Sequence, residues 1–142
     1  MTANRKTPVK GIPIREGLFT NPSEPGENAH LLGSRCQECA QVFFPPRSIC
    51  SKCFNTKWDR VPLSRKGKLY TYTIIGYPAP GLSAPYAVAY IDLPEGIRVF
   101  SILTGWKEKE LEKGMDMEMV IERFKEDERG NVILTYKFRP IQ

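Results

Sequence analysis

The 142-residue chain contains one histidine, His30, and no cysteine outside residues 36–53. The chain therefore has few residues from which a Cys–His or Ser–His pair, the usual basis of nucleophilic catalysis, could form. A glycine-rich phosphate-binding loop of the Walker type is also absent. The carboxylates of Asp92 and Glu95 flank an expected turn, where acidic side chains are usually solvated. The sequence thus offers no catalytic set, and we expect no catalytic residue in this chain alone.

Long apolar runs are absent as well. No stretch approaches the roughly 20 residues that a membrane-spanning helix needs. The N-terminus is polar and basic and lacks the apolar core of a signal peptide. We therefore expect a cytoplasmic protein without membrane contact, in a compartment where thiols stay reduced and disulfides are disfavoured.

The four cysteines form two C-x2-C pairs separated by ten residues: Cys36, Cys39, Cys50 and Cys53. This spacing is typical of a zinc ribbon, in which two tight turns aim four sulfurs at one tetrahedral metal. A closed shell of four thiolates leaves no position for water, which predicts structural zinc; iron in a rubredoxin-like site stays open. His30 precedes the first pair by six residues and is either a fifth candidate ligand or a packing or capping residue.

The positive charge is concentrated around the cysteines. Residues 34–68 carry eight Lys or Arg against two acids, a net charge of +6, whereas the whole chain carries +5. Such a surface concentrates anions, although a merely solubilising face is the alternative. The same hairpin carries phenylalanines that it is too small to bury completely. These rings beside arginines predict one of two uses: stacking on a purine whose phosphates pair with the arginines, or docking onto the barrel or a second protein. The candidate ligand-binding residues are Arg35, Phe43, Phe44, Arg47 and Lys52.

The order of β-forming segments indicates the fold. Strands are expected at 68–75, 86–93, 97–103, 115–124 and 132–138, with a two-turn helix at 106–114 closed by Gly114. Three strands, a helix and two strands is the order of an OB-fold barrel. We therefore predict a mainly β protein with three parts: an irregular or partly helical N-terminal arm (1–33), a zinc ribbon (34–62) and a five-stranded OB-fold barrel (63–142).

Residues 30–140 also resemble a known family. The relevant motifs are the arginine before the first cysteine pair, the aromatic-Pro-Pro-Arg stretch of residues 44–47, the segment "GKLYT" at 67–71, and "PY" at 85–86 followed by a strand and an "EG" turn. The chain is similar in these respects to the acyl-CoA-associated OB-fold proteins with an N-terminal rubredoxin-like zinc ribbon. The arm matches poorly.

The resemblance implies a function. Members of this family are small subunits bound to thiolase-superfamily enzymes, or to hydratases and aldolases, and they assist coenzyme A binding. It implies a thiolase-like large subunit as partner in a hetero-oligomer, an acyl-CoA ligand and a structural Zn²⁺. One reaction within the family, thiolysis of benzoylsuccinyl-CoA in anaerobic toluene breakdown, is a candidate for the complex. The acyl group is left open, because the residues that select it are expected on the partner.

Single-stranded nucleic-acid binding is the alternative function, since OB-folds and zinc ribbons both serve it. Residues 105–130 of the barrel carry nine acids and six bases. A groove that follows a phosphate backbone needs positive charge across the barrel. The charge distribution therefore disfavours nucleic acid as a partner.

Overall fold

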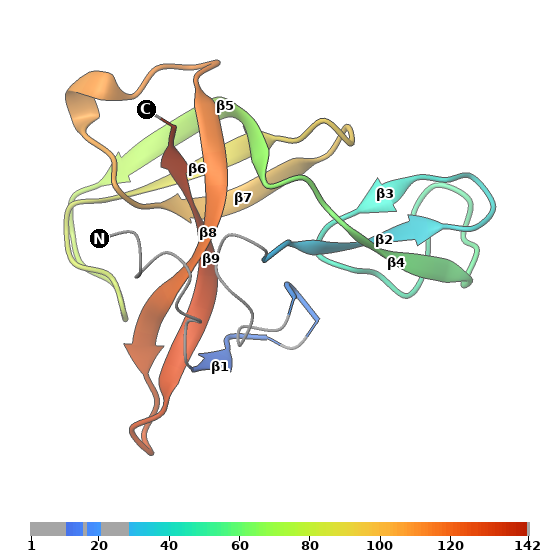
Figure 1. Ribbon diagram of the computed structural model, residues 1–142, viewed down its shortest axis with the longest axis horizontal. Helices are drawn as coiled ribbons and strands as arrows, with labels where there is room; N and C mark the ends of the chain where they lie inside the picture. Colours follow the sequence, from blue (N-terminus) through green and yellow to red (C-terminus); the bar gives the residue numbers. More distant parts are fainter. Residues whose placement is uncertain (1–10, 16, 21–28, 142) are drawn as a thin grey trace.

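The computed structural model describes residues 11–15, 17–20 and 29–141, and it is built almost entirely of strands (Figure 1). A three-stranded sheet contains β2 (Leu32–Cys36), β3 (Val42–Phe43) and β4 (Trp58–Pro62). A six-stranded sheet contains the short β1 (Ile12–Pro13) and five longer strands. These five are β5 (Lys66–Ile75), β6 (Tyr86–Asp92), β7 (Arg98–Leu103), β8 (Asp116–Glu126) and β9 (Val132–Pro140).

The five longer strands close into a barrel, which confirms the predicted fold class. Strands β5, β6 and β7 form an antiparallel meander, and β8 pairs with β5. Closure comes from β9, which runs parallel to β7 and antiparallel to β8. The β8–β9 hairpin is long and extends beyond the other three strands (Figure 1). Closure leaves fewer exposed sheet edges than an open sheet would have.

The predicted helix at 106–114 is wrong. The segment holds only one turn of 3₁₀ helix, Glu108–Glu110, with extended backbone on both sides and no side-chain cap. A helix of two turns is unfavourable by itself, because nucleation costs conformational entropy and so short a helix forms few hydrogen bonds to offset it. Leu111 is buried from extended backbone instead. Gly114 does adopt a positive φ of 89°, but its N–H donates to the Leu69 carbonyl (2.7 Å) and so connects the segment to the barrel.

The core lies inside the barrel and follows the alternation of the strands. On β8, Met117, Met119 and Ile121 are buried, while the residues between them are more exposed. Phe138 of β9 is fully buried against the same interior. None of the described residues forms a helix long and apolar enough to cross a membrane.

The described part of the N-terminal arm packs on the barrel. Strand β1 pairs in parallel with the start of β9, and Phe19 forms a bridge with Leu31. Leu18 and Phe19 are both buried in the core cluster. Residues 11–15, 17–20 and 29–33 contain the short strand β1, the first two residues of β2 and no helix; the expectation for 1–10, 16 and 21–28 lies outside the described residues.

The three-stranded sheet forms a lobe beside the barrel (Figure 1). Gly33 on β2 has no room for a side chain, because a Cβ there would lie 2.8 Å from the Phe43 carbonyl oxygen. The Phe44 ring meets Tyr136 of β9 edge-on, with centroids 5.6 Å apart. At the junction with the barrel, the Ser64 N–H and hydroxyl donate to Glu95 (2.7 and 2.8 Å). The lobe is therefore attached to the barrel by both apolar and polar contacts.

Candidate metal centre and basic ribbon surface

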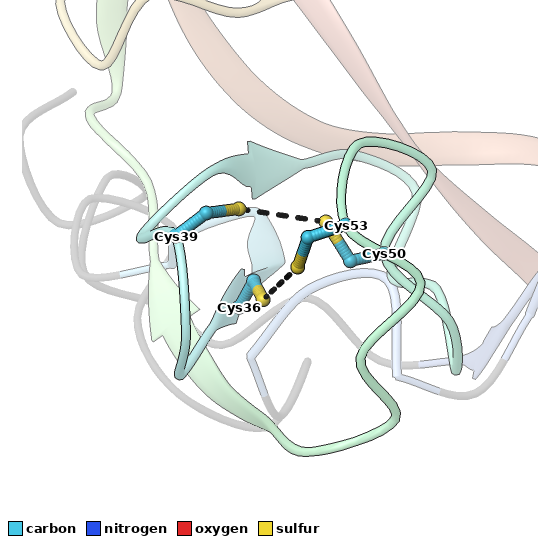
Figure 2. A group of neighbouring side chains, drawn as sticks. All are labelled: Cys36, Cys39, Cys50 and Cys53. Atoms are coloured by element: carbon cyan, nitrogen blue, oxygen red, sulfur yellow. Dashed lines mark hydrogen bonds between the residues drawn. The ribbon is translucent and has the colours of Figure 1, made fainter.

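The first cysteine pair lies in a tight turn that begins at Cys36, the last residue of β2. The Cys36 N–H donates to the Gln41 carbonyl (2.9 Å), and the Ala40 N–H donates to the Cys36 carbonyl (3.0 Å). Ala40 has a φ of 63°, which turns the chain back toward β3. This geometry places the sulfurs of Cys36 and Cys39 on the same side of the turn (Figure 2).

The second pair repeats this turn between β3 and β4. The Cys50 N–H donates to the Asn55 carbonyl (2.9 Å), and the Phe54 N–H donates to the Cys50 carbonyl (2.8 Å). Phe54 has a φ of 64°, the counterpart of Ala40. Two C-x2-C spacings have thus produced two turns with the same hydrogen bonds.

The two turns bring all four sulfurs together (Figure 2). The Cys36 and Cys53 sulfurs are 3.4 Å apart, those of Cys39 and Cys50 are 3.6 Å apart, and all four lie within 4.8 Å of one another. None of the four forms a disulfide. Sulfurs at about 2.3 Å from a tetrahedral zinc stand about 3.8 Å apart, so the donor set fits the ion. The four cysteines predicted as ligands converge in one cluster.

Backbone amides give a net lowering of the thiol pKa at two of the four positions. The N–H of Cys39 is the main reason that the pKa of Cys36 falls to about 6, with a further contribution from the N–H of Glu38. Burial raises the pKa of Cys50, but the N–H groups of Cys53 and Lys52 outweigh it and lower that pKa. Peptide N–H groups directed at sulfur favour the charged ligand form that zinc requires.

The exposed Cys53 behaves differently. The backbone N–H of Asn55 lowers its pKa, but contact with the Cys36 sulfur and burial raise it to about 12. Four negative sulfurs cannot share so small a volume without a cation. Binding of a dication releases the remaining protons and offsets two of the four negative charges, so metal binding and folding of the ribbon are coupled.

His30 is not part of this cluster. Its Nδ1 lies 3.0 Å from the Leu63 carbonyl oxygen, a distance at which the Nδ1–H tautomer donates a hydrogen bond. Its backbone N–H donates to the Thr20 hydroxyl (3.0 Å). Among the described residues, the four cysteines are the one group of three or more His, Cys, Asp or Glu placed to hold a metal. The packing interpretation of His30 therefore holds, and the metal shell is closed by sulfur.

The predicted ligand-binding residues divide between two environments. Arg35, Arg47 and Lys52 are exposed on the ribbon. The Arg47 guanidinium lies 5.4 Å from the centroid of the Phe43 ring, and the Arg47 N–H donates to the Ser34 hydroxyl (3.0 Å). The structure thus brings Arg47 and Phe43 together as a cation–π pair.

Phe44 lies apart from that pair. It packs against the barrel core, and its ring contacts Tyr136. Phe44 directly follows β3 (Val42–Phe43), at a bend in the chain, so it does not continue the face of the strand on which Phe43 lies. Phe43 is on the basic surface, and Phe44 joins the ribbon to the barrel.

Sequence reasoning missed two exposed apolar residues, Ile49 and Phe54. They are 52% and 76% exposed, and they flank the second cysteine pair. One signal was available for Phe54. A residue directly after C-x2-C enters the left-handed backbone region that glycine prefers, so a phenylalanine there is unusual.

The barrel also has an aromatic outer face, on β5, β6 and β7. Tyr90 and Phe100 are cross-strand neighbours with ring centroids 5.3 Å apart, and Tyr70 is exposed beside a bulge in β5. The Arg98 guanidinium stacks on Tyr70 at 3.4 Å and bonds Asp92 at 2.6 Å. The cation of this face is therefore already paired with an acid.

Comparison with known proteins shows which family has this combination of a zinc ribbon and a barrel. Residues 24–59 match the family described as "ChsH2, rubredoxin-like zinc ribbon domain", and residues 60–122 match "ChsH2, C-terminal OB-fold domain". The chain is 41% identical to a DUF35 domain-containing scaffold protein of Methanocaldococcus jannaschii over 79% of this chain and 82% of that protein. It is 35% identical to benzoylsuccinyl-CoA thiolase subunit BbsA of Thauera aromatica over 87% of this chain and 85% of that one.

A solved structure has a similar fold over most of both chains. It is described as the Ltp2-ChsH2(DUF35) aldolase, and the match has a TM-score of 0.67 at 29% identity over 78% of this chain and 84% of that one. The zinc ribbon, the barrel and the sequence matches agree over both parts of the molecule. The chain therefore belongs to the ChsH2-type, DUF35-containing family of proteins that join a rubredoxin-like zinc ribbon to an OB-fold.

Proposed function

We propose that this chain is a non-catalytic small subunit of a thiolase-superfamily complex, where it assists binding of acyl-CoA and assembly of the active site. The observation that carries the proposal is the similarity to a thiolase subunit, which extends over 85% of that subunit's length. A metal shell closed by four sulfurs, with no open position for substrate, supports a structural role for the ribbon. The acyl chemistry is assigned to a thiolase-like large subunit in a hetero-oligomer.

The basic ribbon surface is the part that meets coenzyme A in this proposal. Arg35, Arg47 and Lys52 are exposed cations suited to the phosphates of the ligand. Arg47 is the best placed, because Phe43 orients its side chain and Ser34 holds its backbone. Preorganisation of this kind lowers the entropic cost of binding.

Phe43 and Phe44 have separate parts in this proposal. Phe43 offers a ring beside the cations, where an adenine can stack. Phe44 keeps β3 in place through its contact with Tyr136. Thiolysis of benzoylsuccinyl-CoA is one candidate reaction, supported by the name of the Thauera relative. The acyl group is selected by the large subunit.

The test is Arg47→Ala in the complex reconstituted with the thiolase-like large subunit of the same organism. Loss of one charged hydrogen bond costs about 1.5–3 kcal/mol, so the Michaelis constant for acyl-CoA should rise roughly 10- to 150-fold. Arg47→Lys should recover part of the loss, since lysine keeps the charge without the planar fork. Zinc content and subunit assembly should stay unchanged.

Lys125→Ala is the matched control. Lys125 also lies over a phenylalanine ring, at 5.8 Å from Phe124, but on the barrel. The substitution Lys125→Ala removes one cation from a similar contact and should leave the Michaelis constant for acyl-CoA unchanged. If Arg35→Ala and Arg47→Ala both leave coenzyme A kinetics unchanged, the ribbon is only structural. If either one dissociates the complex, the basic surface belongs to the protein partner.

Single-stranded nucleic-acid binding is favoured by one observation, the aromatic face of β5, β6 and β7. The charges of that region oppose it, because Arg98 pairs with Asp92 and Lys68 pairs with Asp116. A phosphate backbone would have to displace both acids. Fluorescence anisotropy with labelled oligonucleotides should show no binding at physiological salt, and salt-sensitive micromolar binding would reverse this preference.

A further inference from the structure

The tip of the second cysteine turn carries two exposed apolar side chains, Ile49 and Phe54. Ile49 precedes Cys50, and the Cys50 carbonyl accepts the N–H of Phe54 at 2.8 Å, so the two residues lie at the two ends of one turn. They are 52% and 76% exposed, and neither contributes to the hydrophobic core. This Ile49–Phe54 tip is distinct from Phe43, which packs beneath Arg47.

Phe54 holds an unfavourable backbone conformation as well as an exposed ring. Its φ of 64° brings the Cβ of an L-residue close to its own backbone, and glycine is the residue best suited to that region. Ala40 has the same conformation in the first turn but carries only a methyl group. Glycine would therefore serve the fold better than phenylalanine, which points to a use for the ring outside the chain.

The charges around the tip indicate what covers it. Residues 34–68, which include the tip, carry eight Lys or Arg against two acids, Glu38 and Asp59. An exposed apolar tip on a lobe with this excess of cations matches a protein interface in which an apolar anchor is accompanied by charged contacts. Isoleucine offers nothing to a nucleotide phosphate. The pair therefore favours an apolar protein pocket over coenzyme A.

We infer that the Ile49–Phe54 tip is a docking anchor, which inserts into an apolar pocket with an acidic rim on the large catalytic subunit. The identity of the partner rests on the proposed function above. The tip supplies binding energy for assembly, while the neighbouring basic surface meets the ligand. The two roles can be tested separately, because Arg47 and Phe54 are positioned by different residues. Arg47 contacts Phe43 and Ser34, whereas the N–H of Phe54 donates to Cys50.

The experiment measures binding of the zinc-loaded full chain to the thiolase-like large subunit by calorimetry. Phe54→Gly removes the ring and relieves the backbone, so the dissociation constant should rise about 10-fold or more. The melting temperature should be unchanged or higher, and the zinc content should be unchanged. Phe54→Tyr, which keeps a ring, should bind within about 3-fold of the unaltered chain. Lys57→Glu should slow association in a salt-dependent way.

Ala40→Gly is the matched control, because it makes the same backbone change in the first turn without removing a ring. It should leave the dissociation constant unchanged. Unchanged binding by Phe54→Gly overturns this inference alone. A raised Michaelis constant for acyl-CoA with intact assembly also overturns it, by assigning the ring to the ligand site. Failure of the unaltered chain to bind the large subunit overturns the proposed function and the partner named here together.

Discussion

The ribbon and the barrel are stabilised in different ways. The barrel buries a continuous apolar cluster that includes Met117, Met119 and Phe138, all fully buried. The buried members of that cluster include no residue of 34–62; from this range only Val42, Phe44 and Val61 pack partly against it. Within the ribbon the buried apolar side chains are the cysteines Cys36 and Cys50. One region depends on apolar burial and the other on metal coordination.

This contrast reflects the size of each region. A ribbon of about 30 residues cannot exclude enough apolar surface from water to offset the entropy of ordering its chain. A metal shell replaces the missing core, because its binding free energy is available only to the folded ribbon. The barrel needs no such help. The two regions should therefore fail under different treatments.

The largest expected effect is loss of the metal. Cys50→Ser, or removal of zinc by a strong chelator, should unfold the ribbon, since structural zinc sites supply about 10–16 kcal/mol of apparent binding free energy. Amide resonances of residues 34–62 should collapse in a two-dimensional NMR spectrum, while those of the barrel keep their dispersion. Metal analysis should find one zinc in the unaltered chain. A folded, metal-free ribbon with four alkylatable thiols would contradict the metal centre.

The converse experiment is Phe138→Ala. Truncation of this fully buried ring should lower the free energy of unfolding by about 3–5 kcal/mol, through lost burial and the cavity left behind. Denaturant titration measures the loss. Zinc stoichiometry should remain at one in the folded variant, because Cys36 and Cys50 lie outside the buried cluster that contains Phe138. Should Phe138→Ala release zinc under native conditions, the two regions would be less independent than their cores indicate.

A smaller effect is expected at Tyr136, where the two regions meet. Its hydroxyl donates to the Phe100 carbonyl (2.8 Å), and its ring contacts Phe44 of the ribbon. Tyr136→Phe keeps the ring and should cost about 1 kcal/mol for the lost hydrogen bond. Lys68→Ala, which breaks an exposed ion pair, is the surface control and should change stability by less than about 1 kcal/mol.

Tyr136 also predicts an alkaline effect with a definite sign. Burial raises its pKa from 10 to about 12, so the folded protein favours the neutral phenol. This stabilisation is fully present below pH 10 and is lost as the pH rises from 10 through 12. Absorbance titration of the six tyrosines should show one late phase that Tyr136→Phe removes. A titration in which all tyrosines ionise near pH 10 would contradict the burial of this group.

Local sequence patterns were sufficient to predict those features that depend only on residue spacing or on the alternation of apolar residues. Two C-x2-C spacings predicted the metal cluster, because the turn that each forms aims its sulfurs without help from the rest of the chain. Alternation of residues such as Met117 and Met119 predicted buried strands, since a strand with one apolar face has a single register that buries it. The family resemblance rested on the same local motifs.

Outcomes that depend on distant contacts were beyond the sequence. The segment 106–114 has helix-forming residues, but burial of Leu111 and the hydrogen bond from Gly114 to Leu69 restrict it to a single 3₁₀ turn. Phe43 and Phe44 are alike as neighbours in sequence, and only the position of Tyr136 separates them. The sequence by itself determined which four cysteines come together and the order of the barrel strands, because these follow from spacing and period. The tertiary structure decided which aromatic rings remain exposed, because that depends on surfaces supplied by residues far along the chain.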